Sequence, residues 1–153
     1  QPASQSIQSA KSRLHANLQS VQYVITHPDI LKISLLLLLF QISWSSYYQY
    51  TGPLLKTVYH YSPERLSFFI SMIAFWLVLG AGPVFKWLNQ RYNSLTILNL
   101  SAIIEIAGIA VSILVYYHYL PEIFFWISAI PVAMGDVLAY ICLTTLYSNV
   151  VPE

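Results

Sequence analysis

Four long apolar segments constrain this chain more than any other feature of its sequence. They lie at about residues 31–54, 66–85, 95–117 and 122–147 of the 153 residues. Each is close to or longer than the ~20 residues that a helix needs to cross ~30 Å of hydrocarbon. A membrane-spanning strand would be shorter and would alternate in polarity, so continuous runs predict helices. We expect an all-α membrane protein with four transmembrane helices at 31–153.

The composition excludes several other classes of protein. Hydrophobic residues make up 57% of the chain and charged residues only 8%, whereas ordinary soluble domains carry about 25% charge. Seven Lys and Arg against six Asp and Glu leave a net charge of +1, so a basic face for nucleic acid is not expected. The single cysteine, Cys142, excludes a disulfide framework and a cysteine-based metal site. We therefore expect an integral membrane protein with no metal and no cofactor.

Charge placement predicts the orientation of the helices in the membrane. One side of the predicted membrane segment carries five basic residues, and the other side carries two. The five are Lys11, Arg13, Lys32, Lys86 and Arg91, and the two are Lys56 and Arg65. Because cytoplasmic loops are enriched in Lys and Arg, both chain ends are expected in the cytoplasm. The polar residues 1–30 would then form a cytoplasmic linker, and the protein would belong to a bacterial inner membrane.

Proline, glycine and serine mark the ends and interruptions of the helices. Ser62 can cap the second helix, Pro63 suits its first position, and Glu64 lies at the positive end of its dipole. Pro121 and Glu122 open the fourth helix in the same way. The run Gly80-Ala81-Gly82-Pro83 is expected to interrupt or end the second helix, and Pro131 to kink the fourth.

Three strongly polar residues fall near the middle of their predicted helices: Gln41, Glu105 and Asp136. An ionisable group is costly inside a bilayer and usually faces a partner or a wet cavity. Transporters place substrate and ion sites near this depth. Asp136 and Glu105 are therefore candidates for proton coupling. No pair of reactive groups is spaced for catalysis, so an enzyme is not expected.

The surroundings of the two acids suggest different roles. Asp136 shares a helix face with Tyr140, Leu143 and Tyr147, and its carboxyl group could exchange a proton or could stay neutral and bind a neighbouring helix. Glu105 shares its face with small residues, which favour a hydrogen bond across a tightly packed helix contact. Those small residues are Ser101, Gly108 and Ser112.

A polar and aromatic stripe runs along the first helix. It consists of Ser34, Gln41, Ser45, Tyr48 and Gly52, with Trp44 beside it. Lipid does not accommodate such a stripe, so it must face protein or water. Substrate contact and hydrogen bonding between helices explain it equally well. The candidates for a substrate cavity are Gln41, Trp44, Ser45 and Tyr48, together with Tyr140 of the fourth helix.

Several short segments, taken in order, resemble one family of transporters. They are His27-Pro28-Asp29-Ile30-Leu31, the run from Tyr59 to Phe69, the basic turn from Leu88 to Asn93, Met134-Gly135-Asp136, and the ending from Tyr147 to Glu153. Nearly the whole chain resembles the start of the second half of a twelve-helix major facilitator superfamily transporter. It is most similar to the drug:proton antiporters of the bicyclomycin and tetracycline type.

The resemblance implies a place for each part of the chain. Residues 1–30 would be the central cytoplasmic loop, and the four spans would be helices seven to ten of the C-terminal six-helix half. Gln41, Tyr48 and Asp136 would border the substrate path, with Glu105 supporting them. In the basic turn, Arg91 matches the family signature, whereas neighbouring residues depart from it. Those are Gln90, Asn93 and Ser94.

The sequence thus predicts part of a secondary active transporter that moves a small amphiphilic molecule, coupled to protons by antiport. Its partners would be the lipid bilayer, the missing N-terminal half and last helices of the same transporter, and a small-molecule substrate, with no nucleic acid. The alternative is a non-transporting four-helix membrane subunit or assembly factor. A complete small multidrug transporter acting as a dimer is disfavoured, because such proteins carry an acid in the first helix, where this chain has Gln41.

Overall fold

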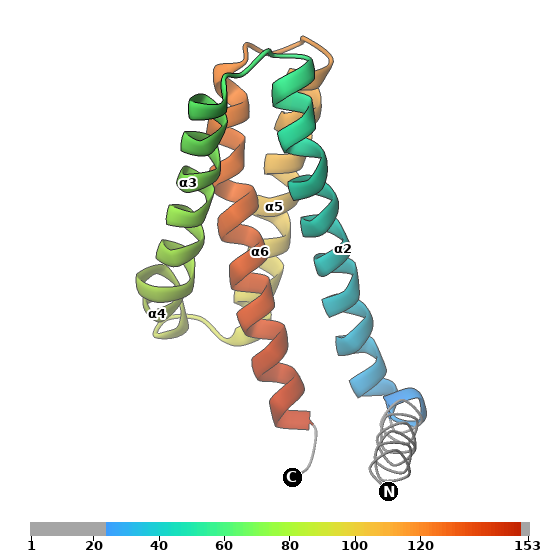
Figure 1. Cartoon of the computed structure of the whole chain (residues 1–153). Coiled ribbons are helices and arrows are strands. Elements are labelled where there is room, and N and C mark those ends of the chain that lie inside the picture. The colour runs from blue at the N-terminus through green and yellow to red at the C-terminus, as the bar shows by residue number, and fades with distance from the viewer. Residues whose placement is uncertain (1–23, 151–153) are drawn as a thin grey trace, which may run out of the picture.

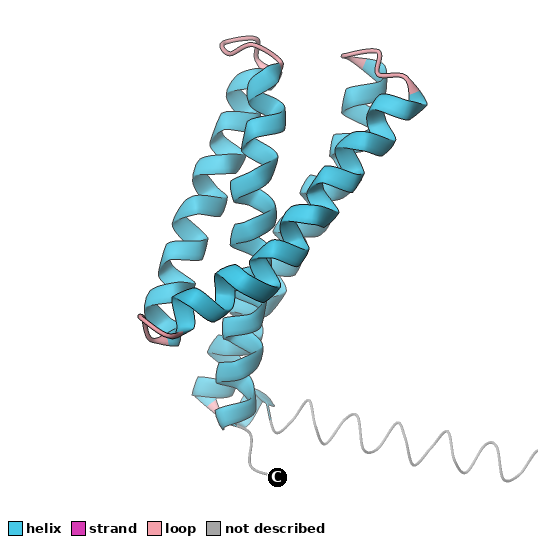
Figure 2. Ribbon diagram, turned by 90° about the vertical axis from the view of Figure 1, so that its left-hand side faces the viewer, coloured by secondary structure: helices cyan, strands magenta, loops and turns pink. Residues whose placement is uncertain are grey.

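A computed structural model describes residues 24–150 of the chain, and these residues form helices joined by short loops (Figures 1 and 2). Residues 1–23, which hold most of the expected linker, lie outside the described part, as do 151–153. Four stretches of helix are long and apolar enough to cross a membrane: Pro28–Thr57, Pro63–Asn89, Ser94–Tyr116 and Ile123–Val150. The expected all-α architecture with four membrane-spanning helices is confirmed.

The helices have the following bounds. The first is α2 (Pro28–Thr57). The second span consists of α3 (Pro63–Leu79), a π-helical turn (Gly80–Val84) and α4 (Phe85–Asn89). The third is α5 (Ser94–Tyr116) and the fourth is α6 (Ile123–Val150). Helix α2 begins at Pro28, so the last three residues of the expected linker, 28–30, are helical. Pro131 lies inside α6, which continues through it.

Local sequence signals account for several helix ends. The Ser62 side chain accepts a hydrogen bond from the backbone N–H of Arg65 at 3.3 Å, and Pro63 takes the first helical position of α3. This confirms the expected cap. Asn93 caps α5 in the same manner, accepting from the Thr96 N–H at 2.8 Å. A capping oxygen satisfies one of the amide groups that a helix start leaves without a partner.

The second span contains a π-helical turn where the sequence predicts an interruption. The turn covers Gly80–Val84 and includes Pro83, after which α4 continues the span to Asn89. Gly80 lies against α6, since a Cβ atom there would be only 2.6 Å from a methyl group of Val137. The absence of a side chain at Gly80 therefore allows this turn to approach α6 closely.

Helix α6 lies at the centre of the bundle. It packs most extensively on α5 and also contacts α2, α3 and the π-helical turn, while α2 and α3 contact each other little (Figure 1). Small residues allow this crowding: Ala129, Ala133, Gly135 and Ala139 of α6 are all buried. Close backbone approach through small residues is the usual way in which membrane helices associate.

Two clusters of buried apolar side chains stabilise opposite ends of the bundle. One contains Leu55, Phe69, Ile73, Val115 and Phe125 and lies toward the α2–α3 and α5–α6 loops. The other lies at the end where α2 begins and α6 ends (Figure 1), and consists of Leu88, Ile97, Leu98, Leu138, Ala139, Cys142 and Leu143. Cys142 thus packs in an apolar environment.

Side chains join the two loops at the end of the bundle opposite the chain termini. The Tyr61 hydroxyl donates to Glu122 Oε1 and accepts from Trp126 Nε1 at 2.7 Å. Arg65 pairs with Glu122 at 2.8 Å and covers the Tyr61 ring, with the guanidinium carbon 4.1 Å from the ring centre. Tyr59 donates to the carbonyl oxygen of Val115 at 3.0 Å. These contacts fix the α2–α3 loop to α5 and α6.

Candidate functional site

The two acids at membrane depth meet where α5 packs on α6. Glu105 of α5 is 3% exposed and Asp136 of α6 is 6% exposed. Gly135 makes this approach possible, because a Cβ atom there would lie 2.7 Å from the Cβ of Glu105. The sequence places the two acids at similar depth on different helices with different expected roles, and the structure brings them close together.

The packed contact expected around Glu105 is confirmed. A Cβ atom on Gly108 would lie 2.9 Å from the carbonyl oxygen of Ser128, so the two backbones are close here as well. The hydroxyl groups of Ser112 and Ser128 are hydrogen-bonded at 2.8 Å across the same contact. Ser101 is fully buried. Small residues therefore form the contact surface between α5 and α6 on both sides of the acids.

The acids have few hydrogen-bond partners. Ser43 of α2 donates from Oγ to Glu105 Oε1 at 3.2 Å. Among the described residues, Glu105 Oε2 and Asp136 Oδ1 are buried with no hydrogen-bond partner. Burying such an oxygen without a partner costs about 1–3 kcal/mol, and more when it is charged. A proton on either carboxyl group would remove a negative charge from this site, so the geometry is suited to proton uptake.

The substrate-cavity candidates on α2 lie on a partly exposed face. Gln41, Ser45 and Tyr48 are exposed, and Trp44 is half-buried. The Trp44 and Tyr48 rings are stacked, with their centroids 5.9 Å apart. Both rings line a cavity of about 230 Å³ between α2 and α3, whose other lining residues are Ile70, Ile73, Ala74 and Leu77. Trp44 thus faces protein and a cavity.

On α6, the expected stripe around Asp136 divides into buried and exposed residues. Leu143 is fully buried, whereas Tyr140 is 45% exposed. The structure therefore does not place Tyr140 in the same buried environment as Asp136. The hydroxyl of Thr144, one turn further, bonds back to the Tyr140 carbonyl at 2.8 Å.

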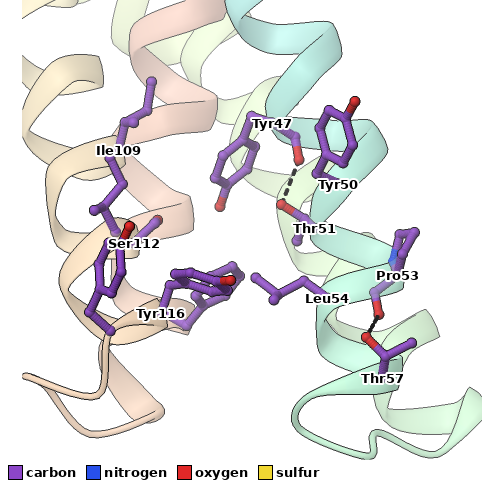
Figure 3. A pocket seen from close by; sticks show the side chains of 12 residues that line it. Tyr47, Tyr50, Thr51, Pro53, Leu54, Thr57, Ile109, Ser112 and Tyr116 are labelled. Carbon is purple, nitrogen blue, oxygen red and sulfur yellow. Dashed lines mark hydrogen bonds between the residues drawn. The ribbon is translucent and has the colours of Figure 1, made fainter.

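A cavity of about 590 Å³ lies between α2 and α5 (Figure 3). Its lining combines apolar side chains with hydroxyl groups of Tyr47, Thr51, Ser112 and Tyr116 (Figure 3). The Thr51 and Thr57 hydroxyls bond back to the carbonyls of Tyr47 and Pro53, at 2.6 and 2.8 Å (Figure 3). An apolar cavity with a few polar groups is typical of small-molecule sites.

The sequence reasoning missed Ser43 and Tyr47. Ser43, Tyr47 and Thr51 follow one another at four-residue spacing, and so form a second polar stripe on α2. That spacing is the signal in the sequence that could have identified them, but the longer stripe through Gln41 and Tyr48 has the same helical periodicity. The Tyr47 hydroxyl is buried and has no hydrogen-bond partner among residues 24–150.

Metal binding finds no support in the described part of the chain. Within residues 24–150, no three His, Cys, Asp or Glu side chains are grouped so that they could hold an ion.

The family comparison covers the entire chain. Residues 1–153 match the family model described as Major Facilitator Superfamily. No match to a curated protein or to a solved structure was found.

Proposed function

The chain belongs to the major facilitator superfamily, and from this premise we propose that it is part of a secondary active transporter that exchanges a small amphiphilic molecule for protons. The family supports a transporter function and an integral membrane location. In this proposal the four helices are helices seven to ten of a drug:proton antiporter type of carrier, and the rest of that carrier is their partner. The protein would act as a transporter and not as an enzyme.

The buried contact between Glu105 and Asp136 is the observation that carries the proton-coupling proposal. Both carboxyl groups are buried near the middle of α5 and α6 where Gly135 packs on Glu105, each with one buried oxygen that has no partner among the described residues. Two negative charges in this position would repel each other in a medium of low dielectric. Taking up one proton would relieve that repulsion, so the pair can alternate between two charge states during a transport cycle.

The polar and aromatic residues of α2 are proposed to border the substrate path. Gln41, Ser45 and Tyr48 are exposed near the middle of a membrane-spanning helix, beside half-buried Trp44, where contact with lipid is unfavourable. Amide, hydroxyl and aromatic groups together suit a molecule that has both apolar and polar parts. Tyr140 of α6 is exposed as well and is proposed to belong to the same path.

Both chain ends are proposed to face the cytoplasm of a bacterial cell. The start of α2, the α4–α5 turn and the end of α6 lie at one end of the bundle (Figure 1). Lys32, Lys86 and Arg91 belong to this end, whereas Lys56 and Arg65 belong to the other. The excess of basic residues supports a cytoplasmic location for that end.

The full-length transporter that contains this chain, reconstituted in proteoliposomes with an imposed pH gradient, provides the test. The probes are a panel of fluorescent amphiphilic dyes on one side and a trapped pH indicator on the other. We expect Asp136→Asn to abolish dye movement driven by the pH gradient, with normal expression. The matched control is Asp29→Asn, since Asp29 is exposed at the start of α2 and pairs only with Lys32 among the described residues.

Two outcomes would contradict the proposal. Wild-type dye transport by Asp136→Asn, with protons still moving in the opposite direction, would exclude a role for Asp136 in coupling. Failure of the wild-type transporter to move any dye would contradict an amphiphilic substrate. A non-transporting membrane subunit, in which the acids only join helices, would show the second result together with reduced stability of Asp136→Asn.

A further inference from the structure

Ser43 makes a contact that differs from those of Thr51 and Thr57 on the same helix. Thr51 and Thr57 each bond back to a carbonyl oxygen four residues earlier in α2, which is the usual partner for such residues. Ser43 instead donates to Glu105 Oε1 on another helix, at 3.2 Å. The contact therefore joins α2 to α5 through two residues that are 62 positions apart in the sequence.

Helix α2 has little else to hold it to α5. Its contacts are mainly with α6, and to a small extent with α3. A cavity of about 170 Å³ separates α2 from α5 beside this hydrogen bond, lined by Phe40, Ser43, Glu105 and Ile109 among others. The Ser43–Glu105 bond thus crosses a loosely packed region. Because few other contacts join α2 and α5 there, this bond contributes strongly to the position of α2 relative to α5.

The strength of this contact depends on the charge of Glu105. A hydroxyl bonds more strongly to an ionised carboxylate than to a neutral carboxyl group. Among the described residues, the ionisable group that faces Glu105 from α6 is Asp136, beside Gly135, and Ser43 is the polar group that contacts Glu105 from α2. Protonation of the acid pair would therefore weaken the contact with α2.

We propose that Ser43 is a positioning residue that links the protonation of the Glu105–Asp136 pair to the position of α2 through its hydrogen bond with Glu105. This inference rests on the proposed proton-coupled function. It extends that function by connecting the acids to the helix that carries Gln41, Trp44 and Tyr48. When Glu105 is ionised, Ser43 holds α2 against α5. When Glu105 is protonated, α2 is released, and the face that borders the proposed substrate path can move.

The test uses infrared titration of protonated carboxyl groups in the full-length transporter in lipid, with no substrate added. The band of the buried pair is assigned by its loss in Glu105→Gln. Ser43→Ala removes the donor that favours the ionised form, so the midpoint of this band should move to higher pH by several tenths of a unit or more. Ser43→Thr keeps the hydroxyl and should restore the wild-type midpoint. The matched control is Ser46→Ala, since Ser46 is exposed on the same helix.

A distance measurement tests the second half of the inference. Spin labels replace Lys32 of α2 and Leu95 of α5, which are exposed near the same end of the bundle. The distance between them should change from mildly alkaline to mildly acidic pH in the wild type, and should not change in Ser43→Ala. An unchanged infrared midpoint in Ser43→Ala, or an unaltered pH response of the distance, would overturn the inference. Normal pH-driven transport by Asp136→Asn would instead contradict the proposed function, so the two failures are distinguishable.

Discussion

Arg65 at the start of α3 and Glu122 just before α6 form an ion pair of 2.8 Å that connects two loops far apart in the sequence. The carboxylate of Glu122 also accepts the hydroxyl of buried Tyr61, which in turn accepts from Trp126 at 2.7 Å. The Glu122 carboxylate thus has two partners, Arg65 of α3 and Tyr61 of the α2–α3 loop, and Trp126 of α6 supports the second of them. Because these contacts share atoms, their energies are expected to be coupled.

A double-mutant cycle with Arg65→Gln and Glu122→Gln measures that coupling. The two side chains are 52% and 35% exposed, so we expect a coupling energy of about 0.5–1 kcal/mol, in the upper range for exposed pairs. The unfolding of the transporter by sodium dodecyl sulfate in mixed micelles, followed by circular dichroism, gives the free energies. The control pair is Asp29 and Lys32, which are 74–77% exposed and 3.4 Å apart, and should show no measurable coupling.

Tyr61 should make stability depend on alkaline pH. Burial, with the hydrogen bond to Glu122 as a second cause, raises the pKa of Tyr61 from 10.0 to about 12. A raised pKa in the folded state means that the stabilisation is complete below pH 10.0 and is lost as pH rises toward 12. Thermal unfolding of the wild type should therefore shift to lower temperature over this range more steeply than that of Tyr61→Phe. Equal slopes would show that the phenol is not protected in the folded protein.

An added methyl group at Gly135 should destabilise the contact between α5 and α6. A Cβ atom there would be 2.7 Å from the Glu105 Cβ and 2.8 Å from the Ser101 carbonyl oxygen. We expect Gly135→Ala to destabilise the protein by about 1–3 kcal/mol, as overpacking usually does. Gly52→Ala is the matched control, because nothing lies within 4 Å of a Cβ atom at Gly52. Similar melting temperatures for the two variants in detergent would contradict the close packing.

Cysteine labelling tests the proposed orientation. With Cys142 replaced by Ala, a membrane-impermeant maleimide should react in intact cells with Tyr119→Cys, in the exposed α5–α6 loop. It should react with Gln90→Cys, in the exposed α4–α5 turn, only after the membrane is made permeable. The reverse pattern would place the chain ends outside the cytoplasm.

Structural features that depend on residues close together in the sequence could be predicted from it. The four apolar runs, the Ser62 cap and the interruption near Gly80 depend on local length, hydrogen bonding and backbone preference, and all three are present. The small-residue stripe around Glu105 also predicted its tight contact, because glycine and serine on a membrane helix leave room for another backbone.

Structural features that depend on how one helix is rotated relative to another could not be predicted from the sequence. The approach of Glu105 to Asp136 requires Gly135 to face α5, and no spacing within either helix fixes that orientation. The same reason explains why Ser43 and Tyr47 were missed. Both polar stripes on α2 follow helical periodicity, and only the position of α5 distinguishes the one that contacts Glu105 from the one that stays exposed.

The π-helical turn at Gly80–Val84 has a consequence for everything that follows it in the second span. A π turn contains one more residue than an α turn. The side chains of α4 therefore point in directions shifted by about one residue relative to an uninterrupted α-helix. Leu88 reaches its buried place in that shifted phase, and Trp87 remains 49% exposed with the Arg91 guanidinium 4.6 Å from its ring centre. Deleting one residue between Gly80 and Val84 would therefore rotate the end of this span, moving Leu88 away from the core while leaving the upstream contacts of α3 in register.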